Sequence, residues 1–117
     1  PDGFAVYSGD DDLTLPMLVL GADGLISVCA NALPGATSEL VRKGLEGDFE
    51  TARHLHFVLL DAMRASFIES NPTPIKAVLA EMGLIESHVR LPLAPLTENA
   101  RSRVLKAYQP FLSGVGV

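Results

Sequence analysis

Three consecutive carboxylates, Asp10, Asp11 and Asp12, form the densest group of chemically competent side chains in this sequence. Carboxylate oxygens are the ligands that Ca²⁺ and Mg²⁺ prefer, so the triplet could bind a divalent cation. The triplet also stands directly before a short stretch that is typical of a helix. Aspartates favour helix starts because they accept hydrogen bonds from the free N–H groups there. Since no second set of ligands is evident, we expect Asp11 or Asp12 to cap that helix, and we predict no metal site.

The other residues that commonly bind metals are isolated. His54 and His56 are two positions apart, which predicts different faces of a helix, whereas zinc pairs on helices are three or four apart. Cys29 is the single cysteine, so an internal disulfide is excluded and a structural zinc site is not expected. A lone thiol is typical of a reducing compartment, which predicts a cytoplasmic protein. His88 lies in a predicted loop and is interpreted as a surface residue.

A lysine could act as a Schiff-base nucleophile if it lay at the end of a strand or in an apolar pocket. Lys43 and Lys106 fall on polar faces of predicted helices, and Lys76 falls near a helix start. The G-x-S-x-G pattern of a serine nucleophile is absent. We therefore predict no catalytic residue in this chain and no cofactor.

Two short apolar segments, Phe4–Ser8 and Leu25–Val28, predict the strands that would position these groups. A short helix is expected between them, ending with Gly21 at the position just after the helix. This strand–helix–strand order is typical of a parallel β/α protein, in which chemistry takes place at the carboxyl ends of strands. Parallel sheets need more than two strands, so the sequence indicates part of a larger fold that associates through its open strand edges.

From Pro34 onward the pattern becomes helical. One helix is expected to end at Gly47, a longer one to be capped by Asp48, a third to stop at Gly83, and a last one to start at Thr97 and to bend or end at Pro110. The segment Asn71–Pro74 is interpreted as a structural link, and Leu91–Leu96 as extended because it holds two prolines. Apolar residues at helical spacing predict the core: Leu40, Val41, Leu45, Leu55, Leu59, Ala62, Met63, Phe67, Ile75, Val78, Leu79, Met82, Val104, Leu105 and Tyr108.

Composition narrows the possible partners. The 117 residues are 48% hydrophobic, which is too apolar for a disordered chain, and suffice for one core. The formal net charge is −5 and the basic residues are scattered, so nucleic acid is not an expected partner. No apolar run approaches the ~18 residues of a membrane span. The start at Pro1 lacks the basic region of a signal peptide and is expected to be the start of an excised piece.

Four segments occur in an order and at a spacing that closely resemble the C-terminal part of the dihydrodipicolinate synthase family, in the pyruvate-aldolase superfamily. They are Ser8–Asp11 (SGDD), Gly24–Asn31 (GLISVCAN), Asn71–Lys76 (NPTPIK) and Val89–Leu96 (VRLPLAPL). The third and fourth segments favour the synthase over its N-acetylneuraminate lyase relatives. The resemblance covers essentially the whole chain.

This resemblance implies an α/β fold: residues 1–47 as the last two β/α units of a (β/α)₈ TIM barrel, and residues 48–117 as a C-terminal helical domain. It implies a tetrameric lyase of lysine biosynthesis that condenses pyruvate with aspartate semialdehyde. In that family a lysine on the preceding strand forms the Schiff base, and a tyrosine relay lies further upstream. Tyr7 and Tyr108 do not match the relay positions. The chain alone is therefore predicted to be inactive.

The resemblance also implies a substrate-binding set. Ile26 matches a residue whose backbone carbonyl faces pyruvate, and its side chain is expected in the barrel core. Gly9 and Asp10 match a loop near the second substrate, and Asn31 matches a residue beside the pocket. Two alternatives remain open at this point: a pyruvate-dependent aldolase of the N-acetylneuraminate lyase type, and a non-catalytic helical oligomerisation module.

Overall fold

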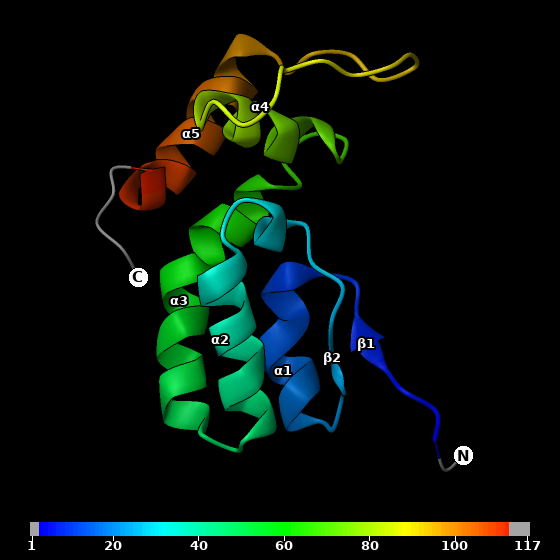
Figure 1. The fold of residues 1–117 in the computed structure, drawn as a ribbon, viewed down its shortest axis with the longest axis vertical. Coiled ribbons are helices and arrows are strands. Elements are labelled where there is room, and N and C mark those ends of the chain that lie inside the picture. Colours follow the sequence, from blue (N-terminus) through cyan, green and yellow to red (C-terminus); the bar gives the residue numbers. More distant parts are fainter. Residues whose placement is uncertain (1–2, 113–117) are drawn as a thin grey trace.

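The computed structural model describes residues 3–112, so residues 1–2 of the predicted barrel units and residues 113–117 of the predicted helical domain lie outside the described residues. In Figure 1 the helices α1, α2 and α3 lie side by side next to the strands β1 and β2, and α4 and α5 lie above them. The elements, in chain order, are β1 (Tyr7–Ser8), the 3₁₀ turn η1 (Asp11–Leu13), α1 (Thr14–Val19), β2 (Gly24–Leu25), the 3₁₀ turn η2 (Cys29–Asn31), α2 (Pro34–Leu45), α3 (Phe49–Ala65), α4 (Thr73–Glu81) and α5 (Glu98–Leu112).

The two strands pair in parallel, with Tyr7 opposite Gly24 and Ser8 opposite Leu25. A Cβ added at Gly24 would lie 3.1 Å from two ring atoms of Tyr7, so the ring occupies the space that a side chain at position 24 would need. The parallel strand–helix–strand order is confirmed.

The predicted strand limits, Phe4–Ser8 and Leu25–Val28, are wrong because the ladder is only two residues long. Outside the ladder the main-chain N–H groups have other partners. The N–H of Val6 donates to the Asp23 carboxylate at 2.7 Å, and the N–H of Val28 donates to the Asp11 carboxylate at 3.0 Å.

The helix after β1 differs from the prediction at its start. Asp10 occupies the position before η1 and makes no side-chain capping bond. The prediction that Asp11 or Asp12 caps this helix is therefore wrong. The Asp11 carboxylate bonds instead to residues 27–29. At the other end the prediction is confirmed, because Gly21 follows the helix with φ +97°.

The starts and ends of the later helices follow local chemistry closely. Gly47 and Gly83 follow α2 and α4 with φ +80° and +73°, as predicted for residues that terminate helices. Asp48 caps α3, since its carboxylate accepts a bond from the Thr51 N–H at 3.2 Å. The Thr97 hydroxyl accepts a bond from the Ala100 N–H at 3.3 Å at the start of α5. That helix does not end at Pro110 but continues to Leu112.

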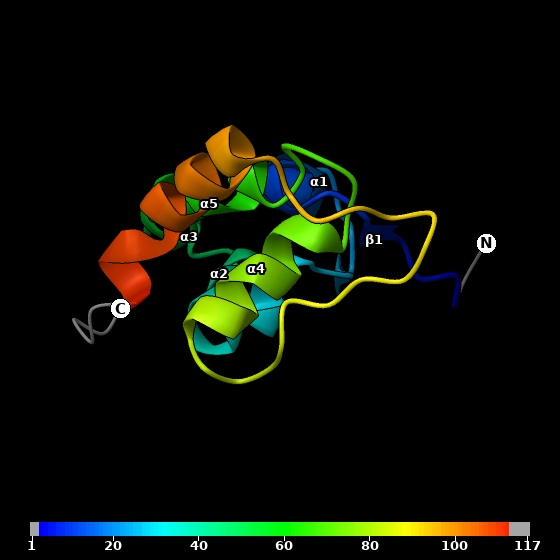
Figure 2. The ribbon, with the colours of Figure 1, turned by 90° about the horizontal axis from the view of Figure 1, so that it is seen from above.

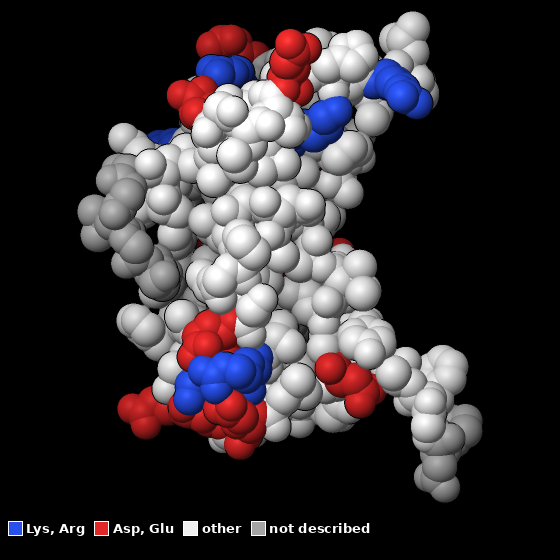
Figure 3. Space-filling view, viewed as in Figure 1, with Lys and Arg blue, Asp and Glu red and all other residues white. Residues whose placement is uncertain are grey.

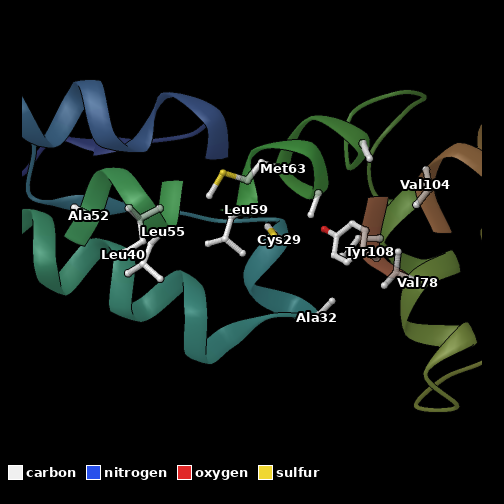
Figure 4. Packing of buried hydrophobic residues seen from close by; sticks show 13 residues of the cluster. Cys29, Ala32, Leu40, Ala52, Leu55, Leu59, Met63, Val78, Val104 and Tyr108 are labelled. Atoms are coloured by element: carbon white, nitrogen blue, oxygen red, sulfur yellow. The ribbon is translucent and has the colours of Figure 1, made fainter. Parts of the chain in front are cut away.

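The core lies between α2, α3, α4 and α5, where their apolar faces meet (Figure 4). Its largest fully buried side chains come from all four helices: Leu40, Leu59, Met63, Val78, Val104 and Tyr108. Burying one such side chain contributes about 1.5–3 kcal/mol. Seen from above, α4 lies beside α5, and the loop between them reaches out beyond the helices (Figure 2).

Three predicted core residues are exposed instead: Leu45 (56%), Phe67 (43%) and Met82 (38%). Each stands at the last residue of its helix or just beyond it. In α2 the buried face is formed by Thr37, Leu40 and Gly44. A Cβ at Gly44 would lie 2.5 Å from Cδ1 of Leu18, so α1 and α2 approach each other closely there.

The apolar residues of the strand side are open to solvent. Phe4 is 72% exposed, Tyr7 51% and Ile26 69%, whereas Leu59 and Val104 on the helical side are fully buried. The space-filling view shows charged side chains toward both ends of one face and an uncharged band between them (Figure 3). One charged group lies at the α2–α3 turn, where Arg42 pairs with Glu39 and Glu46, and Lys43 pairs with Glu46 and Asp48.

Candidate functional site

Two loops leave the carboxyl ends of the parallel strands at the same edge of the sheet (Figure 1). The first begins at Ser8 and the second at Ile26. The Ile26 N–H donates to the Ser8 carbonyl at 2.9 Å, which holds the two loops side by side. The buried Ser8 hydroxyl donates to the Asp10 carbonyl at 2.7 Å and so fixes the turn of the first loop.

Asp11 joins the two loops. Its side chain is fully buried and accepts a hydrogen bond from the Ser27 hydroxyl, from the Val28 N–H at 3.0 Å, and from the Cys29 N–H at 3.3 Å. The Ser27 hydroxyl oxygen in turn accepts a bond from the Ala30 N–H at 2.8 Å. The carboxylate therefore satisfies the free N–H groups at the start of η2, a helix start that lies 17 residues further along the chain.

The sequence reasoning missed this role of Asp11. The available signal was an acid directly after one strand and a serine with small residues directly after the next, two loops that a parallel sheet brings together. Local capping rules assign the same acid to its own helix, so they point to the wrong partner.

All four predicted site residues lie at this edge. Gly9 and Asp10 come from the first loop, Ile26 and Asn31 from the second, and all four are exposed. The Asn31 amide nitrogen donates to the Val28 carbonyl at 3.0 Å, which orients that side chain against its own loop. The Ile26 side chain is 69% exposed, and the two strands have no cover on that face among residues 3–112. The expectation that this side chain lies in the core of a whole barrel stays a prediction.

A buried polar cluster lies behind the second loop. The Tyr108 hydroxyl is 2.7 Å from the Ser66 hydroxyl, which donates to the Ala62 carbonyl at 2.9 Å. Burial raises the pKa of the Cys29 thiol to about 11 and raises the pKa of the Tyr108 hydroxyl as well. Both groups are therefore protonated at neutral pH, so this cluster connects α5 and α3 to the loop without offering a nucleophile.

The histidines do not converge on a metal site. His54 is exposed and His56 is buried, which confirms that they lie on different faces of α3. His56 Nδ1 has no hydrogen-bond partner within the described part of the chain, its ring meets Phe57 edge-on at 5.6 Å, and burial lowers its pKa. Asp12 pairs with Arg64 at 3.5 Å. Among residues 3–112, no three side chains of the His, Cys, Asp or Glu type are grouped so as to hold a metal.

The lysines are distant from the strand ends or already bonded. Lys43 lies 3.3 Å from both Glu46 and Asp48, and these carboxylates raise the pKa of its amine. Lys76 donates to the His88 carbonyl. Lys106 is exposed on α5.

None of the helices described between residues 3 and 112 is long and apolar enough to cross a membrane.

Comparison with known proteins shows which proteins this chain resembles. A model of the Dihydrodipicolinate synthetase family matches residues 1–110. The chain is 56% identical over 114 residues to the 4-hydroxy-tetrahydrodipicolinate synthase of Salinibacter ruber, which covers 96% of this chain and 38% of that relative. It is 48% identical over 110 residues to the enzyme of the same name from Aquifex aeolicus, covering 92% of this chain and 37% of that relative.

Solved structures agree. The crystal structure of dihydrodipicolinate synthase from Aquifex aeolicus superposes with a TM-score of 0.92 at 41% identity, covering 95% of this chain and 38% of that structure. The 4-hydroxy-tetrahydrodipicolinate synthase from Methylacidiphilum fumariolicum superposes with a TM-score of 0.91 at 39% identity, covering all of this chain and 41% of that structure. The chain thus spans less than half the length of the relatives that it matches.

Proposed function

The chain belongs to the Dihydrodipicolinate synthetase family, and from that membership we propose that it is the C-terminal part of a lyase that condenses pyruvate with aspartate semialdehyde. Its fold is the α/β fold of a TIM-barrel fragment, mostly helical with a small parallel sheet. We propose that residues 1–47 supply the last two β/α units and residues 48–117 a helical domain. The relatives compared above are named as synthases, which favours the synthase over the N-acetylneuraminate lyase type.

One observation carries the proposal: two loops at the carboxyl ends of neighbouring parallel strands are bonded to each other and remain accessible. Barrel enzymes build their active sites from such loops. In the proposed site the Ile26 carbonyl faces pyruvate, Gly9 and Asp10 lie near the second substrate, and Asn31 lies beside the pocket. All four residues are exposed in the described part of this chain.

The proposed reaction needs a nucleophilic lysine from outside this chain. A Schiff base forms when a neutral amine attacks a carbonyl. The carboxylates around Lys43 hold it protonated, and Lys76 is bonded to a carbonyl, so neither is suited to that attack. We therefore propose that this chain supplies one wall of the pocket and is inactive alone.

The open strand side supports a further part of the proposal, namely that the missing barrel portion covers it and that the whole protein is a homo-oligomer. Phe4, Tyr7 and Ile26 form an exposed apolar face beside two open strand edges. Such edges pair with other chains when they are left uncovered. The isolated chain should therefore associate, and a sharp monomer boundary in sedimentation at micromolar concentration would contradict this.

The catalytic proposal is tested by joining this chain to the part of the Salinibacter ruber relative that it does not cover. Pyruvate with borohydride should give a stable mass adduct on a lysine of the added part, and none on this chain alone. Condensation activity should return in the joined protein. An adduct on Lys43, Lys76 or Lys106, or a folded joined protein without any adduct, would overturn the proposal.

A matched pair of variants tests the assignment of the pocket wall. Asn31→Ala in the joined protein should raise the KM for substrate several-fold, because it removes a polar group beside the pocket. Ser38→Ala, an exposed position on α2, should leave the KM unchanged. Equal behaviour of the two variants would remove Asn31 from the proposed site.

A further inference from the structure

Asp11 is the one acidic side chain that is buried among residues 3–112, and the family assignment above gives it no role. A buried carboxylate is costly unless hydrogen bonds replace its water. Here three donors do so: the Ser27 hydroxyl, the Val28 N–H and the Cys29 N–H. Its neighbours differ from it, because Asp10 is exposed and Asp12 pairs with Arg64 at the surface.

The three donors directly follow the peptide that carries the Ile26 carbonyl. That carbonyl belongs to the peptide unit between Ile26 and Ser27, and the Asp11 bonds begin at the Ser27 side chain. On the other side, the Ile26 N–H is bonded to the Ser8 carbonyl at 2.9 Å. The orientation of the peptide unit is therefore set by β1 before it and by Asp11 after it.

We infer that Asp11 is a positioning residue: it aims the Ile26 carbonyl at the pyruvate site by clamping the loop 27–29 to the first loop. This inference rests on the proposed function, since it takes the Ile26 carbonyl as the group that meets pyruvate. Asp11 itself does not touch substrate, because all of its side chain is enclosed by protein. Pre-orientation of this kind lowers the cost of binding because the loop is already ordered.

The inference predicts a specific kinetic pattern in the joined protein described above. Asp11→Asn replaces one acceptor oxygen with an N–H₂ donor that faces other donors, so the loop loses its fixed geometry. The KM for pyruvate should rise about tenfold, corresponding to about 1.4 kcal/mol, while kcat changes much less. Asp12→Asn, which alters the neighbouring acid, should leave both constants unchanged. A folded Asp11→Asn protein with the wild-type KM would overturn the inference.

A second measurement does not depend on activity. Hydrogen exchange of the Val28 and Cys29 amides should be at least tenfold faster in Asp11→Asn than in wild type, and unchanged in Asp12→Asn. If wild type forms no pyruvate adduct, the proposed function fails, and the exchange result still decides whether Asp11 orders the loop. Unchanged exchange at both amides would overturn the clamp itself.

A milder variant covers the case in which Asp11→Asn does not fold. Ser27→Ala removes one of the three donors and leaves the carboxylate bonded to both N–H groups, so the fold should persist. The KM for pyruvate should rise two- to threefold. If both variants fold, their effects should be non-additive in the double variant, because both act on one hydrogen-bonded unit. A wild-type KM in Ser27→Ala would count against the inference.

Discussion

The helical side and the strand side of this molecule differ in how completely they shield their apolar side chains. Leu59, Val104 and Tyr108 are fully buried between α2, α3, α4 and α5, whereas Phe4 and Ile26 on the strand side are 72% and 69% exposed. Helices satisfy their backbone internally, so neighbouring helices can close a core within a short chain. Strands satisfy theirs through neighbours, so two strands leave faces and edges open. The difference indicates that the helical side carries most of the stability of the chain, whereas the strand side needs a partner to cover it.

The largest test of this difference is a pair of leucine truncations. Leu59→Ala should lower the free energy of unfolding by about 3 kcal/mol, because it leaves a cavity in a fully enclosed site. Leu91→Ala, at a position that is 91% exposed, should change it by less than about 0.5 kcal/mol. Urea unfolding of both variants measures the two values, and similar losses would mean that the helical core is not closed.

Phe4→Ala tests whether the strand side is covered in the joined protein. In the 117-residue chain this substitution should be nearly neutral, since the ring is 72% exposed. In the joined protein it should cost about 3 kcal/mol if the added barrel portion buries the ring, as for other buried phenylalanines. The comparison of the two denaturation curves provides the measurement. A neutral effect in both would show that this face stays open.

Two tyrosines allow a finer test. Tyr108→Phe removes the hydroxyl that bonds the Ser66 hydroxyl at 2.7 Å inside the core, and should cost about 1 kcal/mol. Tyr7→Phe removes a hydroxyl from a ring that is 51% exposed, and its effect on the melting temperature should be negligible. If Tyr7→Phe costs as much as Tyr108→Phe, the strand side is more ordered than its exposure indicates.

The smallest expected effect is a pH dependence at the margin of the helical core. Burial lowers the pKa of His56 in the folded state, so the unfolded chain takes up a proton first as the pH falls. The stabilisation is complete above the unfolded pKa of about 6.5, and it is lost as the pH falls from there through the lower folded pKa. His56→Gln should flatten this part of the stability–pH curve. Equal slopes in wild type and His56→Gln would refute the effect.

The sequence predicts well those features that nearby residues determine. Asp48 caps α3 and Gly83 ends α4 because each bond or turn involves residues within a few positions. Leu55, Leu59 and Met63 are buried because helical spacing puts them on one face. Leu45 and Met82 share that spacing but lie at helix ends, and spacing alone does not tell where the neighbouring helix stops.

Features that depend on residues far apart in the sequence cannot be predicted from these local rules. Asp11 follows a strand and precedes a helix, so local chemistry assigns it to the nearer helix start, while its donors lie 16 to 18 positions away. The length of a parallel strand likewise depends on its neighbours, and β1 and β2 have only each other among the described residues. The proposed site depends on both of these long-range features. Local patterns therefore located its two loops but not Asp11, which binds the loops together.

The contact between Tyr7 and Gly24 affects which substitutions this sequence can accept at these two positions during evolution. A Cβ added at position 24 would lie 3.1 Å from two atoms of the Tyr7 ring, so this exposed ring would have to shift by a few tenths of an ångström to accommodate it. We expect relatives that carry a larger residue at position 24 to carry a smaller one at position 7. Positions 7 and 24 would then covary in an alignment of relatives. Such covariation would indicate that the two strands pair, which the substitution rate at either position alone would not reveal.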